Sequence, residues 1–215
     1  MSLKENLKNN TLLSAIGSFY RNYLSVTRKK FGYIHPTAFY RQPILIKGVE
    51  NVYMEEGSHI LGHSVIITTR AKFILKKHSG AAEGLTVVTG NHEFTVGEWG
   101  MNVPDSIKSD EYDKDVVVEE DVLMMSNVTL LSGVRVGRGS LVGSGAVVRN
   151  NVPPYAIVLG NPARIVGFKF TPEEIVEHEK ALYSEYERIP LEKLEKNYEK
   201  YFLKRIDKIR EFNRI

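Results

Sequence analysis

The sequence predicts a mainly β protein, a solenoid of stacked parallel coils with a helical extension at each end. Three observations predict it. A six-residue repeat runs through the second half of the chain, the same pattern recurs in the first half, and helix signals lie outside both. Short strands joined by a turn at every sixth position are typical of a solenoid and are not needed in a bundle or a sandwich.

The repeat is clearest from residue 118, where six consecutive hexads read VEEDVL, MSNVTL, LSGVRV, VGRGSL, VGSGAV and VRNNVP. The first position is always apolar, and the fifth is always small or β-branched. The fourth is always Asp, Asn or Gly, which favour tight turns or tolerate a positive φ. Each hexad is therefore predicted to be a short strand and a corner, and three hexads to close one triangular coil.

The same pattern occurs upstream, with Ser58 and Ser64 in the fifth column and Gly84 and Gly90 at corners. Its leading residues are Met54, Ile60 and Ile66 and, after a slip of three residues, Leu75, Ala81 and Val87. These segments predict further coils of the same solenoid.

The register fails from residue 93 to about residue 115, in EFTVGEWGMNVPDSIKSDEYDKD, a segment that contains the only tryptophan, Trp99. A solenoid expels such an insertion as a loop at a corner, and long loops of this kind are usually functional. His92 is the last residue before the loop, so we expect a rigid scaffold to hold it at the root of a flexible segment.

Helical extensions are predicted at both ends, as residues 1–33 and 169–215 around a central domain of residues 34–168. The first is amphipathic, with Leu7, Ile16 and Tyr23 among its apolar residues, and ends in basic residues 28–30. In the second, residues 171–174 read as a capping box with proline at the first helical position, and the helix is predicted to run to about Arg188. A second helix should follow to the C-terminus. Covering the open ends of the solenoid is the favoured role of both extensions, ranked above contact of the N-terminal helix with a membrane surface.

Composition narrows the class of protein. The 215 residues carry a net charge of +3 and no cysteine, so nothing indicates a nucleic-acid partner, a disulfide or a thiolate metal site. No run of about 18 apolar residues and no recognisable signal peptide is present, which favours a cytoplasmic protein.

Residues 134–167, VRVGRGSLVGSGAVVRNNVPPYAIVLGNPARIVG, resemble the left-handed parallel β-helix acyltransferases built from hexapeptide repeats. The likeness is greatest to acetyl-CoA-dependent O-acetyltransferases of the galactoside/maltose and cell-surface polysaccharide type. It extends over roughly residues 34–168 and ends on the signature Gly160 to Arg164. The resemblance implies a left-handed coil, acetyl-CoA as co-substrate without a metal, and a homotrimer with active sites between subunits.

The resemblance also implies residue roles. His92 matches the general base, and a neutral imidazole with a pKa of about 6.5 suits removal of a hydroxyl proton. Trp99 is expected to wall the acceptor pocket. Glu93 is a candidate for the acceptor side or for orienting His92, and an outward-pointing, solvated carboxylate is the favoured interpretation. The N–H of Ser126 matches the donor to the oxyanion.

The same resemblance places Gly143 and Ser144 along the pantetheine arm of acetyl-CoA, and Arg149 and Arg164 at its phosphates. The chain departs from many relatives at residues 123–126, which read LMMS where those relatives carry Trp-Ile-Gly-Ala/Ser.

The predicted function is therefore direct transfer of an acetyl group to a hydroxyl of a sugar or cell-surface polysaccharide precursor. One alternative is an amino sugar or antibiotic as acceptor, as in the xenobiotic acetyltransferases, and another is a non-enzymatic binding solenoid. A zinc site of the γ-carbonic anhydrase type is not predicted. That type needs a His-x-x-x-x-His pair, whereas His59 and His63, four residues apart, are interpreted as exposed corner residues.

Overall fold

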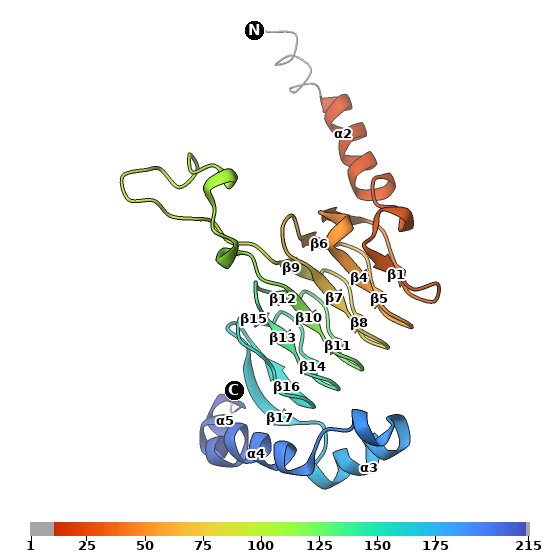
Figure 1. Ribbon diagram of the computed structural model, residues 1–215, viewed down its shortest axis with the longest axis vertical. Coiled ribbons are helices and arrows are strands. Elements are labelled where there is room, and N and C mark those ends of the chain that lie inside the picture. The colour runs from red at the N-terminus through yellow and green to blue at the C-terminus, as the bar shows by residue number, and fades with distance from the viewer. Residues whose placement is uncertain (1–10, 214–215) are drawn as a thin grey trace.

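The computed structural model describes residues 11–213 and shows a three-sided solenoid with a protruding loop and helices at both ends (Figure 1). Three sheets form its sides, and their strands are parallel except for the last pair, β16 and β17. The predicted mainly β solenoid with terminal helices is confirmed.

Each coil visits the three sheets in the same order. Sheet 1 contains β1 (Tyr33–Ile34), β4 (Val52–Met54), β7 (Phe73–Leu75), β10 (Val116–Val118) and β13 (Arg135–Val136). Sheet 2 contains β2 (Phe39–Tyr40), β5 (His59–Ile60), β8 (Gly80–Ala81), β11 (Leu123–Met124), β14 (Leu141–Val142), β16 (Ala156–Leu159) and β17 (Arg164–Phe168). Sheet 3 contains β3 (Ile44–Lys47), β6 (Ser64–Ile67), β9 (Thr86–Val88), β12 (Thr129–Leu130) and β15 (Val147–Val148). We call the turns after sheets 1, 2 and 3 corners 1, 2 and 3.

The pairing register follows the repeat. Val118 lies beside Val136 in sheet 1, and Leu130 lies beside Val148 in sheet 3. Each pair joins residues three hexads apart, so equivalent positions stack in columns along the solenoid. The column of leading residues forms the core, and all of its members are buried: Met54, Ile60, Ile66, Leu75, Ala81, Val87, Val118, Met124, Leu130, Val136, Val142 and Val148.

The fifth position of the six hexads from residue 118 is also buried, as are Ser58 and Ser64 upstream, so the column includes hydroxyls. The Oγ of Ser58 donates to the carbonyl of Glu55 at 2.7 Å, and the Oγ of Ser140 donates to that of Pro153 at 3.0 Å. A short hydroxyl is tolerated in this column because it bonds to the corner backbone beside it.

The corners use the backbone conformation that the fourth position predicts. Asp121 and Asn127 have φ values of 55° and 59°, and the glycines at 133, 139 and 145 have φ of 70° to 80°. Asn151 is the exception among the six hexads. Its side-chain Oδ1 accepts a hydrogen bond from the N–H of Arg135 at 2.8 Å, so the amide rather than a left-handed backbone shapes this corner.

The C-terminal helices cover one open end of the solenoid. Strand β17 runs antiparallel to β16 and ends the parallel stack. The tail follows as α3 (Pro172–Leu182), η6 (Glu185–Glu187), α4 (Leu191–Tyr201), η7 (Leu203–Arg205) and α5 (Ile206–Asn213). The capping box at Thr171 is confirmed, but α3 ends at Leu182 and not near Arg188. The reason is a second capping box, in which Ser184 and Glu187 begin the short helix η6.

A buried carboxylate joins the tail to the solenoid. Glu179 of α3 is only 1% exposed, and it accepts hydrogen bonds from the Tyr155 hydroxyl at 3.0 Å and from Arg138 at 3.2 Å. Its other oxygen accepts from the N–H of Ile189 at 2.5 Å. Burial, and then the Glu179 carboxylate, raises the pKa of Tyr155 far above its usual range, so this hydroxyl stays a donor.

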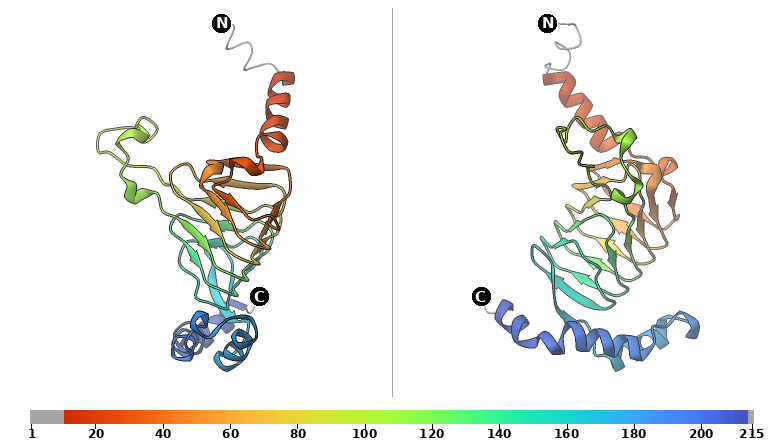
Figure 2. Two further views of the ribbon diagram at one scale, coloured as in Figure 1. Left: turned by 45° about the vertical axis from the view of Figure 1, so that its right-hand side comes forward. Right: turned by 60° about the vertical axis from the view of Figure 1, so that its left-hand side comes forward.

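At the other end, residues 26–31 cover the solenoid, with Val26 and Phe31 in the main core. The preceding α2 (Thr11–Phe19) and the π-helical turn η1 (Tyr20–Leu24) bury no residue, and α2 projects away from the coils (Figure 2). The expectation that the N-terminal helix covers the open end is therefore wrong for α2. Leu7 lies outside the described residues. No helix within residues 11–213 is long and apolar enough to cross a membrane.

Replacing Glu179 with alanine should loosen the tail, because it leaves the Tyr155 hydroxyl and the Arg138 guanidinium without this acceptor. We expect the free energy of unfolding to fall by roughly 1–3 kcal/mol. Urea denaturation would measure the change. Glu177→Ala is the matched control, since this exposed carboxylate of the same helix pairs with Lys180 at the surface. An equal loss in both variants would contradict the buried anchor.

Candidate active site

A long loop leaves corner 3 between β9 and β10 (Figure 1). His92 lies at the neck of this loop, four residues after the end of β9. Both of its neighbours are bonded across this neck. The side-chain amide of Asn91 donates to the carbonyl of Tyr112 at 3.4 Å, and Glu93 accepts from the N–H of Ser109 at 2.7 Å. The His92 side chain itself is exposed, so the neck fixes its backbone while leaving the imidazole accessible.

A buried ion cluster ties the same neck to the adjacent coil. Asp113, whose side chain is almost fully buried, pairs with Lys108 at 2.7 Å and with Arg70 at 3.4 Å. Arg70 belongs to corner 3 of the preceding coil, so the root of the loop is anchored to the solenoid by charge as well as by backbone bonds.

Beyond the neck the loop presents apolar side chains to solvent. Trp99 is 81% exposed, and Phe94, Val96 and Met101 are similarly uncovered. Trp99 therefore forms no closed wall within a single chain. A cluster of large exposed apolar side chains of this kind usually meets another surface.

Corner 2 carries backbone donors that the solenoid leaves unused. The N–H groups of Met125 and Asn127 bond to neighbouring coils at 2.8 Å, whereas that of Ser126 between them has no acceptor within the described chain. Ser144 holds the equivalent position one coil further on, and its N–H is likewise without an acceptor among residues 11–213. Corner 2 thus offers a column of free N–H groups.

Gly143, also on corner 2, packs closely against the next coil. A Cβ atom at this position would lie 2.1 Å from the Cδ2 of Leu159 on the next coil. A larger residue would push that side chain outward along corner 2.

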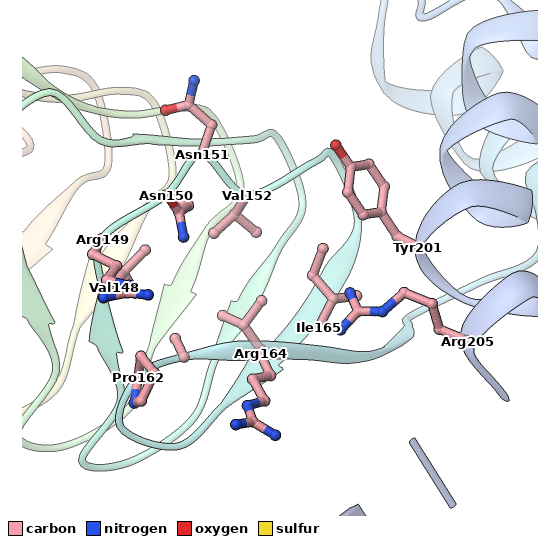
Figure 3. Close-up of a pocket in the computed structure, with 12 residues that line it drawn as sticks. Val148, Arg149, Asn150, Asn151, Val152, Pro162, Arg164, Ile165, Tyr201 and Arg205 are labelled. Atoms are coloured by element: carbon pink, nitrogen blue, oxygen red, sulfur yellow. The ribbon is translucent and has the colours of Figure 1, made fainter. Parts of the chain in front are cut away.

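A basic pocket of about 450 Å³ lies at the C-terminal end of the solenoid, lined by residues 148–152 at corner 3 and by residues 162–165 of the last hairpin (Figure 3). Arg149 and Arg164 line it, as do Arg205 and Tyr201 from the C-terminal tail. None of the three arginines forms an ion pair with a carboxylate of the described chain. The pocket therefore keeps three uncompensated guanidinium groups, which suit bidentate binding of phosphates.

Some predicted site residues are brought together, and others are not. Arg149 and Arg164 share one pocket, and Ser126, Gly143 and Ser144 lie on corner 2. His92 lies on corner 3, with a whole side of the prism between it and Ser126. A single chain does not assemble a base and an oxyanion donor around one reacting atom.

Two pocket residues, Tyr201 and Arg205, were not identified from the sequence. They lie on the polar-rich helices of the tail, where a basic or aromatic residue is ordinary helix surface, and no motif distinguishes them. Only the folding of the tail against the last coil brings them to Arg149 and Arg164.

The interpretation of His59 as an exposed corner residue is wrong. His63 does occupy a corner, with a φ of 59°, but His59 lies in β5 with its ring stacked on Phe39 at 5.2 Å. Burial, together with the charge of Arg41, lowers the pKa of His59. Within the described chain, no group of three or more His, Cys, Asp or Glu side chains could hold a metal ion.

Known proteins share both the repeat and the fold of this chain. Residues 115–150 match the sequence family described as bacterial transferase hexapeptide (six repeats). No curated protein matches the sequence. A hexapeptide-repeat acetyltransferase from Vibrio cholerae O1 biovar eltor, solved with acetyl coenzyme A, is 21% identical. That match covers 78% of this chain and 98% of the other, with a TM-score of 0.60.

Two further solved structures show the same fold. A maltose O-acetyltransferase from Clostridium difficile 630 is 18% identical, covering 74% of this chain and 85% of its own, with a TM-score of 0.59. An N-acyltransferase from Bacillus cereus, in complex with dTDP and coenzyme A, is 15% identical, covering 72% and 92%, with a TM-score of 0.53. The chain carries the hexapeptide repeat and has the fold of the hexapeptide-repeat acetyltransferases, as its residues predicted.

If the basic pocket holds phosphates, Arg205→Ala should weaken binding of coenzyme A by roughly 10-fold or more, because charge-assisted hydrogen bonds are lost. Isothermal titration calorimetry would measure the Kd. Arg210→Ala is the matched control, since this arginine lies exposed on the same tail and outside the pocket. Equal Kd values for the two variants would remove Arg205 from the site.

Proposed function

We propose that the protein is an acetyl-CoA-dependent acetyltransferase that acetylates a hydroxyl of a sugar or of a cell-surface polysaccharide precursor. The observations that carry the proposal are a track of two N–H groups on corner 2, those of Ser126 and Ser144, and a pocket at the end of the solenoid lined by three arginines. Within residues 11–213 the two N–H groups have no acceptor and the three arginines have no carboxylate partner. An extended, phosphate-bearing acyl carrier fits such a track.

Acetyl-CoA supplies an activated thioester, and the chain's own residues would bind and orient it. Arg149, Arg164 and Arg205 are proposed to hold the phosphates. Ser144 and Gly143 would lie along the pantetheine arm, with the Ser144 N–H available as a donor.

In the proposed mechanism, the imidazole of His92 accepts the proton of the acceptor hydroxyl as that oxygen attacks the thioester carbonyl carbon. The N–H of Ser126 donates a hydrogen bond to the oxygen on which negative charge develops. The carbon–sulfur bond then breaks, and the proton held by His92 passes to the departing thiolate. No residue becomes acylated, which agrees with the lack of cysteine in the chain.

This mechanism requires a second copy of the chain, because His92 and Ser126 lie on different corners. We propose a homotrimer in which corner 3 of one subunit faces corner 2 of the next. The apolar loop residues around Trp99 would then be covered by the neighbour and wall the acceptor pocket. Glu93 would act mainly on the loop, since it already bonds to Ser109.

Acylation of an amino group is a second candidate, favoured by one specific observation. The fold is shared with an N-acyltransferase as well as with a maltose O-acetyltransferase. A non-enzymatic solenoid is less well supported, because it would need neither the bonded neck around His92 nor the basic pocket.

His92→Ala should lower the rate of acetyl transfer by roughly 10²- to 10⁴-fold, the usual cost of losing a general base. Thiol release from acetyl-CoA would be measured against sugars, amino sugars and antibiotics, and the chain has no thiol of its own to interfere. The class of acceptor that stimulates thiol release would distinguish acetylation of a hydroxyl from acetylation of an amino group.

The matched control for this variant is Asn91→Ala, which removes one neck bond beside the imidazole and leaves the imidazole itself. Acetyl-CoA binding should be close to unchanged in His92→Ala. A wild-type rate in that variant on a good acceptor would exclude His92 as the base.

A further inference from the structure

The N-terminal arm, residues 11–30, is an apolar and basic segment whose helical part, residues 11–24, buries no residue against the solenoid. Its helical part, α2 with η1, carries large side chains at 16, 19, 20, 23 and 24, a spacing that puts them on one side of a helix. Ile16, Phe19 and Tyr20 are each more than half exposed, as is Leu24, and Tyr23 is also exposed.

The opposite side of this helix is small and polar. Gly17, Ser18, Arg21 and Asn22 occupy it, and the amide of Asn22 donates to the hydroxyl of Ser18 at 3.2 Å. The helix is therefore amphipathic, with its apolar side facing solvent and not the core.

The arm is also strongly cationic. Residues 11–30 contain four Lys or Arg and no Asp or Glu. Arg28 and Lys30 donate to backbone carbonyls, namely those of Ala38, His35 and Ser25, so their charge is not neutralised by these bonds. Arg21 and Lys29 are exposed.

We infer that this arm binds the surface of an anionic lipid bilayer, lying in the interface with its apolar side in the acyl region. Residues 11–24 would span roughly 21 Å as a helix, too short for a hydrocarbon core of about 30 Å, so the arm lies on the membrane and does not cross it. Aromatic side chains such as Tyr20 and Tyr23 suit the headgroup region, and clustered basic residues suit anionic lipids.

Charge favours lipid over a second copy of the arm. Packing arms against one another would bring their cations together, with no acidic residue in the segment to compensate, whereas anionic headgroups attract the same cations. The position of the arm agrees with a docking role. It projects from the end of the solenoid opposite the C-terminal helices (Figure 2), two residues of which, Tyr201 and Arg205, line the basic pocket.

The test is co-sedimentation of the full chain with vesicles. We expect binding to phosphatidylcholine vesicles that contain about one-third phosphatidylglycerol, weaker binding to pure phosphatidylcholine, and loss of the difference at high salt. The double variant Ile16→Glu, Phe19→Glu should lower binding at least about 10-fold, because two apolar anchors become charged. Lys29→Gln with Lys30→Gln should weaken binding only to the anionic vesicles.

The matched control is Tyr186→Glu, which makes the same kind of change at a side chain that is 88% exposed near the other end of the molecule. It should leave vesicle binding unchanged. Absence of vesicle binding, or equal binding by the Ile16→Glu, Phe19→Glu variant, would overturn the inference. Light scattering provides a second test. If wild-type protein does not sediment with lipid and the Ile16→Glu, Phe19→Glu variant forms a smaller oligomer than wild type, the arm binds another copy of the chain and the inference is wrong. Acetyl transfer to a soluble acceptor reports separately on the proposed function.

Discussion

The parallel pairing between successive coils is the constraint on which the rest of the structure depends. It joins residues three hexads apart, so every position of the repeat becomes a straight column along the solenoid. The leading column builds the core, and the corner columns build edges. The free N–H groups of Ser126 and Ser144 are aligned for the same reason, because equivalent positions repeat at the coil spacing of about 4.8 Å. A binding track along corner 2 is thus a direct consequence of the ladder that stabilises the fold.

The regular part of the fold was predictable from the sequence because each hexad repeats the same physical requirements. Apolar leading residues are buried, and Asp, Asn or Gly take the corner, as at Asp121 and Gly139. The prediction fails where a local side-chain hydrogen bond determines the backbone conformation in place of the repeat or the helix pattern. Asn151 shapes its corner through its side chain, and Ser184 restarts a helix that was expected to continue. It also fails for α2, because amphipathicity indicates an apolar side but not which surface covers it.

The candidate site was predictable only in part. His92 could be located because the repeat lapses directly after it, and Arg149, which lies within the last hexad, could be located only through the family resemblance. Arg205 and Tyr201 could not, since they reach the pocket through the tertiary packing of the tail. The sequence also did not predict that His92 and Ser126 lie on different corners of one chain. A linear repeat does not indicate which corners of two neighbouring chains face each other. The proposed arrangement therefore rests on geometry that only the folded chain supplies.

Complementation between two inactive variants would test the shared site most directly. His92→Ala removes the base on corner 3, and Ser144→Trp would block the track on corner 2. If each site combines corner 3 of one subunit with corner 2 of another, oligomers assembled from equal amounts of both should recover about a quarter of the wild-type rate, since intact halves then meet at some interfaces. Mixed oligomers that remain as inactive as their parents would contradict the account.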